Sequence, residues 1–486
     1  MRQSGRRYAT VAWVASLGMA AVARAGDEAP PAPQEKPAAE TKAAPASGET
    51  KAAPASGERA RAVAAAESAP NAPPAEKPWY ERIRIGGQVR ARGEFRDPRE
   101  YRLPGTFGLP DTAESEDPID FVESRIRLHA DAKVSDVVSA FIQIQDSRRF
   151  GDEGSALADT EGVDLHQGYF DVRDIADSPL DLRVGRQELS YGDQRLVSPL
   201  DWSNIGRAWD GARLRYRPEK TTVDLFATVI DENDTLDDDL FFGGLYATRP
   251  LGDGALRTGD VYVFWRHTNE ESFVGEDGTA EGLDEFTPGA RIDGAVEGVF
   301  DYKLEGAYQF GDWGGDDLSA YAVAAVVGHT FEPEWKPRIQ LEYDYASGDD
   351  DPDDGDRGTF DALFPFGHYY QGFMDLVGWK NSHTLQLSGF AEPHADWKLR
   401  LDVLSFWQAE GEDAWYDAAL RPVRRDATGD SDDHIGVEVD LSARWAAAKG
   451  LDVQMGYSHF FAGAFVDDTG FDDDQDWVWL MATVSF

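Results

Sequence analysis

Cysteine is absent from the 486 residues of this chain. Its absence excludes disulfide bonds, thiol catalysis and cysteine-based metal sites. Long apolar runs are missing as well: after the first 25 residues none approaches the ~20 residues that a membrane-spanning helix needs, and the mean hydropathy is −0.49. The sequence therefore excludes a helical membrane protein.

Basic residues are few in comparison with acidic ones. The chain has 47 Lys and Arg against 90 Asp and Glu, which gives a formal net charge of −43. Hydrophobic residues make up 41% and aromatic residues 12% of the chain. This content provides for a large buried or lipid-facing surface and excludes a wholly disordered protein.

The first 78 residues differ in composition from the rest. Residues 1–25 have the cationic start (MRQSGRR), the small apolar stretch and the cleavage signature Ala23-Arg24-Ala25 of a secretory signal peptide, with a membrane anchor as the alternative. Residues 26–78 are rich in Ala, Pro, Glu and Lys and repeat TKAAPASGE in tandem. We expect a disordered, extended linker there, followed by one folded domain over residues 79–486.

Apolar and polar residues alternate along the folded domain. In RIRIGGQVRARGEF (82–95) the Ile, Val and Phe residues occupy one face and four arginines the other, and FVESRIRLHADAKV (121–134) repeats this pattern. Such alternation predicts strands with one apolar and one polar face. The segments reach about ten residues, the length of a strand that crosses a bilayer, whereas strands of soluble proteins have about five or six.

Short and long connections also alternate, as in transmembrane barrels. Short connections include 135–136, 217–221, 332–335 and 447–450, and long ones include 231–239, 269–285, 347–358 and 466–476. The chain ends in WVWLMATVSF, an alternating segment with a terminal aromatic residue that is typical of outer-membrane proteins. We predict an all-β, antiparallel, up-and-down transmembrane barrel of about 18 strands (range about 16 to 20) in a bacterial outer membrane.

The polar strand faces carry many arginines. Because the apolar faces meet lipid, we expect these arginines to line an anion-selective lumen. Ion pairs across strands that stiffen the wall are the alternative, since later strands bring acids at Glu305, Glu342, Asp344, Asp402, Glu438 and Asp440. The candidate pore-lining and substrate-binding residues from this pattern are Arg82, Arg84, Arg90, Arg92, Arg125, Arg127, Arg183, Arg186, Arg213, Arg215 and Glu123.

Acidic residues form clusters in the connections, at 231–239, 312–317, 349–356, 426–433 and 467–476, which we expect on the extracellular side. We interpret these clusters as solvated loop tips, with a Ca²⁺-bridged outer rim as the alternative. Asp350, Asp351, Asp353 and Asp354 are only weak calcium candidates, because Pro352 occupies a ligand position of the calcium-loop pattern. No other metal and no cofactor is expected.

Three segments resemble the outer-membrane alginate export family. They are RVGRQELSYGDQRLVSPLDWSNIGRAWDGARLRY (183–216), TFDALFPFGHYYQGFMD (359–375) and GYSHFFAGAF (456–465). The resemblance implies an 18-stranded barrel with a narrow, arginine-rich pore that passes a polyuronate outward. By motif context it places pore arginines at Arg186, at Arg125 or Arg127, and at Arg213 or Arg215. The resemblance also covers motif positions to which we assign no role, namely Tyr191, Asp193, Gln194, Arg195, Trp202, Asn204 and Arg207. Of these, Asp193 is added to the candidate pore-lining and substrate-binding residues.

The sequence therefore predicts an outer-membrane channel for an anionic polysaccharide. A general anion or oligosaccharide porin is the main alternative, and a barrel enzyme or a purely structural barrel are less favoured, since neither a Ser/His/Asp spacing nor an HExxH motif is present. The expected partners are the polysaccharide, outer-membrane lipid, and periplasmic polysaccharide-synthesis or secretion proteins. We expect a monomeric barrel and no nucleic-acid partner.

Overall fold

A computed structural model describes residues 79–97, 101, 119–151, 162–231 and 239–486. The expected signal peptide (1–25) and linker (26–78) lie outside these residues, as does most of the acidic cluster 231–239. Within them, no helix is long and apolar enough to cross a bilayer.

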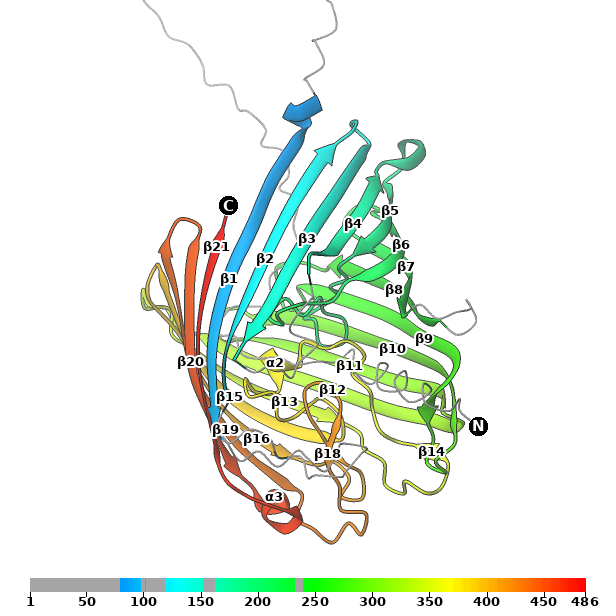
Figure 1. Cartoon of the computed structure of the whole chain (residues 1–486), viewed down its shortest axis with the longest axis vertical. Coiled ribbons are helices and arrows are strands. Elements are labelled where there is room, and N and C mark those ends of the chain that lie inside the picture. Colours follow the sequence, from blue (N-terminus) through cyan, green and yellow to red (C-terminus); the bar gives the residue numbers. More distant parts are fainter. Residues whose placement is uncertain (1–78, 98–100, 102–118, 152–161, 232–238) are drawn as a thin grey trace, which may run out of the picture.

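The described residues form one closed antiparallel barrel (Figure 1). Its sheet has 19 strands, of which β14 (Asp356–Arg357) is a two-residue parallel addition, so 18 strands build the wall. The last strand, β21 (Gln475–Ser485), pairs with the first, β1 (Ile83–Asp97), and closes the ring. The predicted fold class and strand number are thereby confirmed.

Between β1 and β21 each wall strand pairs with the next one along the chain. These strands are β2 (Ile119–Lys133), β3 (Val138–Phe150), β4 (Asp164–Val172), β5 (Leu180–Gln187), β6 (Trp209–Tyr216), β7 (Thr222–Asp231), β8 (Leu240–Pro250), β9 (Thr258–Val274), β10 (Ala280–Val296), β11 (Phe300–Trp313), β12 (Asp316–Thr330), β13 (Arg338–Ala346), β15 (Ser382–His394), β16 (Trp397–Trp407), β19 (His434–Ala448) and β20 (Leu451–Ala462). The smaller elements are η1 (Trp79–Arg82), η2 (Ile175–Asp177), α2 (Gly367–Tyr370), β17 (Trp415–Tyr416), β18 (Pro422–Arg424) and α3 (Ala464–Thr469).

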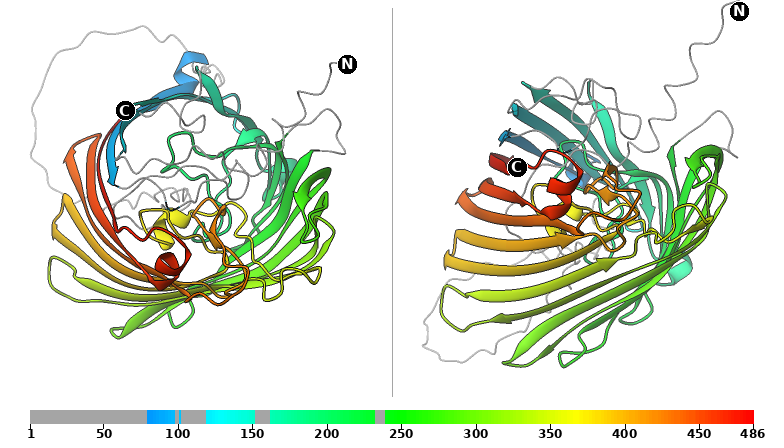
Figure 2. Two further views of the ribbon diagram at one scale, coloured as in Figure 1. Left: turned by 60° about the horizontal axis from the view of Figure 1, so that its bottom comes forward. Right: turned by 90° about the horizontal axis from the view of Figure 1, so that it is seen from below.

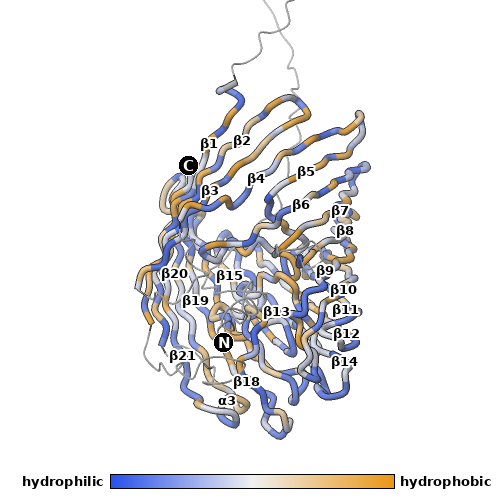
Figure 3. The backbone as a smooth tube through the Cα atoms, turned by 45° about the vertical axis from the view of Figure 1, so that its right-hand side comes forward, coloured by the Kyte–Doolittle hydropathy of each residue, from blue (hydrophilic) through white to orange (hydrophobic). Residues whose placement is uncertain are grey.

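Hydrophilic and hydrophobic residues follow one another along the wall strands (Figure 3), and the two faces of the wall differ as the alternation predicted. On β1, Ile85 and Val89 are 78% and 42% exposed on the outer face, whereas Arg90 and Arg92 on the inner face are 3% and 1% exposed. A wall with an apolar exterior and a polar interior is the pattern of a barrel that lies in lipid.

Connection length separates the two ends of the barrel. One end has short turns such as 395–396 and 449–450, and the other has the long connections 188–208, 347–381 and 408–433. In membrane barrels the short turns are periplasmic and the long loops extracellular.

One predicted long connection is wrong. Over residues 269–285 the strands β9 and β10 continue to pair as far as Val274 and Ala280, so only the turn 275–279 remains. Apolar and polar residues do not alternate strictly at this end of the hairpin. The strands still pair there because backbone pairing satisfies the N–H and C=O groups whatever the side chains are. A β-bulge between Glu281 and Leu283 accommodates the shift in register.

The long connections fold back into the barrel (Figure 2). We call 188–208 the β5–β6 loop and 347–381 the β13–β15 loop. The two loops are joined by backbone hydrogen bonds from Ser198 N to Phe364 O (2.9 Å) and from Phe364 N to Leu196 O (2.9 Å). Around them, apolar side chains from loops and wall form two buried clusters. The extracellular part of the interior therefore has a packed core of its own.

Candidate functional site

The arginines of β1 and β2 form one patch on the inner face of the wall. Arg90 lies directly opposite Arg125, Arg92 opposite Glu123, and Gln88 opposite Arg127. Cross-strand partners share a face of the sheet, so this pairing brings the four guanidinium groups together. All four arginines are less than one-tenth exposed.

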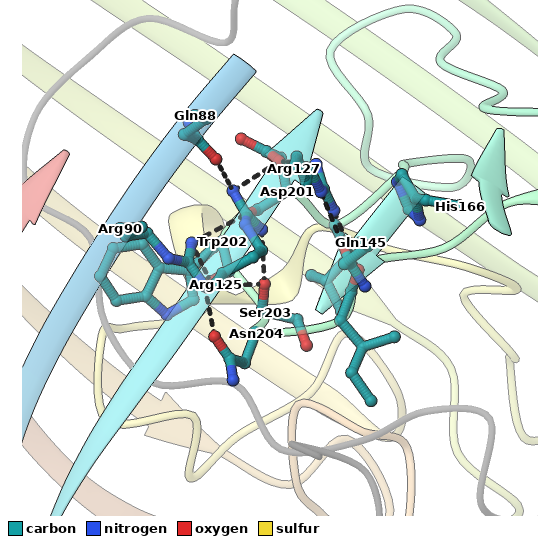
Figure 4. Close-up of polar contacts among 12 residues, drawn as sticks. Gln88, Arg90, Arg125, Arg127, Gln145, His166, Asp201, Trp202, Ser203 and Asn204 are labelled. Carbon is teal, nitrogen blue, oxygen red and sulfur yellow. Dashed lines mark hydrogen bonds and ion pairs between the residues drawn. The ribbon is translucent and has the colours of Figure 1, made fainter. Parts of the chain in front are cut away.

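The β5–β6 loop turns its backbone oxygens toward this arginine patch (Figure 4). Arg90 donates to Trp202 O (2.9 Å) and Ser203 O (3.0 Å). Arg125 donates to Asp201 O (2.7 Å) and Ser203 O (2.9 Å), and Arg92 also donates to Trp202 O (2.9 Å). Neighbouring guanidinium groups repel one another, and these carbonyl dipoles offset that repulsion.

The carboxylate of Asp201 supplies the patch with a negative charge. Its Oδ1 accepts from Arg127 Nη1 (2.6 Å) and from Arg125 Nη2 (3.0 Å). The Asp201 side chain is 41% exposed, whereas those of Arg125 and Arg127 are 1% and 7% exposed. Asp201 therefore lies at the boundary between the arginines and open space.

Trp202 links the arginine patch to the second loop. Its side chain is fully buried. The guanidinium carbon of Arg92 lies 4.2 Å from the ring centroid, and His368 of α2 stacks on the indole at 5.3 Å. The cation–π contact and the stacking hold both loops to β1.

Glu123 is a buried acid of this region, as is Glu94, which lies 2.7 Å from Arg92 Nε. The carboxylate of Glu123 pairs with Arg92 and, at 2.7 Å, with Arg149. The predicted candidate thus lies on the inner face, where it neutralises two arginines of the wall.

Acidic residues on the inner face of the later strands bind the β13–β15 loop. Glu438 Oε1 accepts from Met374 N (2.8 Å), and Asp440 Oδ2 accepts from Phe373 N (3.3 Å). Carboxylates of the wall thus bind amides of the β13–β15 loop. Arginines of the wall bind carbonyls of both loops, since Arg400 donates to Tyr369 O (3.3 Å).

Charged loop residues complete this attachment. Arg195 pairs with Glu342 and, at 2.9 Å, with Asp344. Arg207 donates to Pro365 O (2.9 Å), and burial lowers the pKa of Arg207 to about 10. Burial alone would raise the pKa of Asp361, but Arg266 and Lys380 lower it to about 2.

Asp193, at the start of the β5–β6 loop, forms a separate charged site. It pairs with Arg291 (2.7 Å) and Lys303 (3.2 Å). Although burial opposes ionisation, Lys303 and Arg291 hold the pKa of Asp193 below its ordinary value. Alternation gave no reason to select Arg291 or Lys303 from the other basic residues of the wall.

The other predicted arginines on the inner face lie toward the short-turn end. Arg183 pairs with Asp171 (2.7 Å) and covers the ring of Tyr169 at 3.7 Å. Arg215 makes two hydrogen bonds of 2.7 Å to the carboxylate of Asp224, and Arg213 Nε is 3.9 Å from the same carboxylate. These arginines are therefore paired with acids of neighbouring strands.

Two predicted arginines near the start of β1 lie outside the arginine patch. Arg84 has an 86% exposed side chain that is 3.9 Å from Asp131. Arg82 donates to Val134 O (3.2 Å) at the end of β2. Both belong to the short-turn rim.

Arg186 differs from the other candidates. It shares a face of β5 with Leu182 and Val184, and Val184 lies opposite Phe170, which is 43% exposed. Alternation therefore places Arg186 on the outer side, where it pairs with Asp210. The structure does not bring Arg186 together with the lumen arginines, and the run Leu180, Leu182, Val184 already carried this signal.

The structure adds nothing to the calcium hypothesis. Among the described residues, no group of three or more His, Cys, Asp or Glu is arranged to hold a metal ion. Calcium binding at Asp350, Asp351, Asp353 and Asp354 stays a prediction from sequence.

Comparison with known proteins gives one family match. The family model "Alginate export" matches residues 81–478. No curated protein sequence matches the chain.

Several solved porins share the fold. Pseudomonas aeruginosa OpdO aligns with a TM-score of 0.54 at 15% identity over 84% of this chain and 97% of that one. Acinetobacter baumannii OccAB4 gives 0.51 at 11% over 83% and 98%, and the Pseudomonas aeruginosa outer membrane protein OprD gives 0.50 at 10% over 83% and 94%. At these identities the likeness concerns the fold.

Proposed function

Because this chain belongs to the alginate export family and forms a barrel of the outer-membrane channel type, we propose that its arginine-bearing lumen passes an anionic polysaccharide outward. The substrate in this proposal is a polyuronate of the alginate kind. Residues 81–478, the bulk of the chain, carry the family match.

The observation that carries the proposal is the arginine patch of β1 and β2. Its guanidinium groups bind the carboxylates of Asp201, Glu123 and Glu94 and several backbone oxygens. A polyuronate offers carboxylates and hydroxyl oxygens in the same way. Charge-assisted hydrogen bonds of this kind are short and directional, and a series of them lets a chain exchange contacts without being trapped.

A general anion or oligosaccharide porin is the second candidate. It is favoured by the pairing of Arg183 with Asp171 and of Arg215 with Asp224, which leaves the short-turn half of the lumen with little free positive charge. Small solutes need only a wet, weakly selective path. The expected lipid contacts, periplasmic partner proteins and monomeric state stay predictions with either function.

Planar-bilayer recording of the full barrel tests the proposal. We expect anion selectivity, and block by a polyuronate at concentrations at which a neutral polysaccharide of equal length has no effect. Arg127→Gln removes a charge-assisted contact of roughly 1.5 to 3 kcal/mol, so it should raise the blocking concentration about tenfold.

Arg186→Gln is the matched control, because this arginine lies on the outer face of the wall. It should leave the block unchanged. Cation selectivity, or equal sensitivity to charged and neutral polymers, would show that the polyuronate proposal is wrong.

A further inference from the structure

The carboxylate of Asp201 binds the arginines of the patch, to which a carboxylate of the substrate would also bind. We propose that Arg125 and Arg127 form a carboxylate-binding site that Asp201 occupies in this structure, and that a carboxylate of the polysaccharide takes the place of Asp201 as the polymer passes. This inference rests on the proposed function, and it adds the site at which one uronate carboxylate is bound and how that site is kept closed.

The geometry at Asp201 is that of a bound carboxylate ligand. One oxygen bridges Arg127 Nη1 (2.6 Å) and Arg125 Nη2 (3.0 Å). Both guanidinium groups are oriented by the wall, since Arg127 Nε donates to Gln145 Oε1 (2.5 Å) and Arg125 Nη2 also donates to Gln88 Oε1 (2.8 Å). The site is therefore preorganised by side chains of β1, β2 and β3 that do not belong to the loop.

The side chain of Asp201 is more exposed to solvent than the arginines that bind the β5–β6 loop. Its side chain is 41% exposed beside arginines that are almost completely buried. By contrast, Arg90 donates its hydrogen bonds to neutral oxygens of the loop, which are Asp201 O, Trp202 O, Ser203 O and Asn204 Oδ1. The carboxylate can thus exchange at the exposed edge of the patch while Arg90 keeps its hold on the loop backbone.

The next carboxylate is less suited to this role. Glu188 Oε1 lies 3.9 Å from Arg127 Nη1, beyond hydrogen-bonding distance, and contacts His166 Nε2 at 2.8 Å. Asp201 is therefore the acid that a polymer carboxylate has to replace at Arg127.

Exchange at this site replaces one carboxylate by another of equal charge. An intramolecular competitor acts at a high effective concentration, so Asp201 holds the site when substrate is scarce. The apparent affinity for a ligand equals the intrinsic affinity multiplied by the fraction of time that the site is free. If Asp201 fills the site about nine-tenths of the time, its removal should strengthen uronate binding about tenfold.

The test compares binding of a uronate tetrasaccharide to full-length wild-type and Asp201→Asn barrels by titration calorimetry and by bilayer block. We expect the dissociation constant and the blocking concentration to fall about tenfold in Asp201→Asn. Asp201→Glu keeps the charge and should stay within about twofold of wild type, and a neutral tetrasaccharide should show no difference.

Asp210→Asn is the matched control. Asp210 also pairs with an arginine, Arg186, and has a comparable 49% exposed side chain, but it lies on the outer face. It should leave uronate binding unchanged. Resistance of each folded barrel to unfolding by detergent and heat confirms that the variants are assembled before they are compared.

Each other outcome overturns the inference. Unchanged or weaker uronate binding in Asp201→Asn, with wild type still blocked by polyuronate, means that Asp201 only positions the loop, and the proposed function stands. If the polyuronate blocks neither wild type nor Asp201→Asn, the proposed function fails as well.

Discussion

The carboxylate of Glu123 lies between two guanidinium groups in the barrel interior, those of Arg92 on β1 and Arg149 on β3. Its side chain is 1% exposed. At the residue scale this arrangement is typical of the wall, where most inward arginines contact a carboxylate or a backbone oxygen. Their charge serves to attach loops and neighbouring strands as well as to attract an anion.

Replacing Glu123 by Gln should destabilise the barrel by about 3 kcal/mol or more, because it removes the negative charge of a buried carboxylate that pairs with both Arg92 and Arg149, and leaves Glu94 as the carboxylate beside Arg92. Denaturant unfolding of the barrel in lipid vesicles, followed by tryptophan fluorescence, measures the loss. Asp131→Asn is the control, since its partner Arg84 has an 86% exposed side chain and such a pair contributes about 0 to 1 kcal/mol. Equal losses in both variants would contradict this account.

At the scale of elements, the β13–β15 loop also contacts the turn 275–279. Gly355 N donates to Glu276 Oε2 (2.7 Å), and Glu276 N donates to Asp316 Oδ2 (2.8 Å). Burial raises the pKa of Glu276 to about 7, with a further contribution from Asp349 and Asp316. The loop is thus attached to the hairpin of β9 and β10 through a carboxyl group that titrates near neutral pH.

This attachment should weaken as the pH rises. The pKa of Glu276 in the folded barrel, about 7, exceeds its ordinary value of 4.5, so the folded state binds the proton more tightly. The stabilisation is complete below pH 4.5 and is lost as the pH rises through 7. Hydrogen exchange of the Gly355 amide, corrected for the intrinsic pH dependence of exchange, should therefore show more opening at about pH 8 than at about pH 5.

Glu276→Gln removes the titrating group and should abolish this difference. A wild-type protein whose corrected exchange at Gly355 does not vary with pH, or a variant that keeps the variation, would show that another group is responsible.

At the scale of the whole molecule, an 18-stranded wall is wide enough for an aqueous channel, but its extracellular part is filled by loops and apolar side chains. The β5–β6 loop is central to this filling, because it contacts the arginine patch on one side and the β13–β15 loop on the other. Conductance should therefore be set by the loops and not by the number of strands.

Shortening the β5–β6 loop tests this directly. Gln187 and Trp209 are paired across β5 and β6, so a short Gly-containing hairpin turn can replace residues 188–208. We expect single-channel conductance to increase roughly twofold or more, because the lumen of a barrel this wide is otherwise aqueous. A Gly/Ser replacement of the short turn 134–137 at the opposite end is the control, and equal conductance in both variants would contradict the prediction.

The sequence by itself determined the wall. Period-two alternation is a local property, so it revealed the lipid-facing and inner faces, the strand number and most of the long connections. It also held the evidence that Arg186 faces outward. It was misleading at 269–285, where backbone pairing continues although the alternation does not.

Only the tertiary structure decided what the inward charges contact. Arg90 and Trp202 are 112 residues apart in the chain, and nothing in their spacing predicts that a guanidinium group of β1 binds that carbonyl. Alternation places a side chain on a face, whereas the acceptor opposite it depends on how a long loop folds back. The inward-facing arginines of β1 and β2 were therefore predictable from the sequence, and the contact of Asp201 with Arg125 and Arg127 was not.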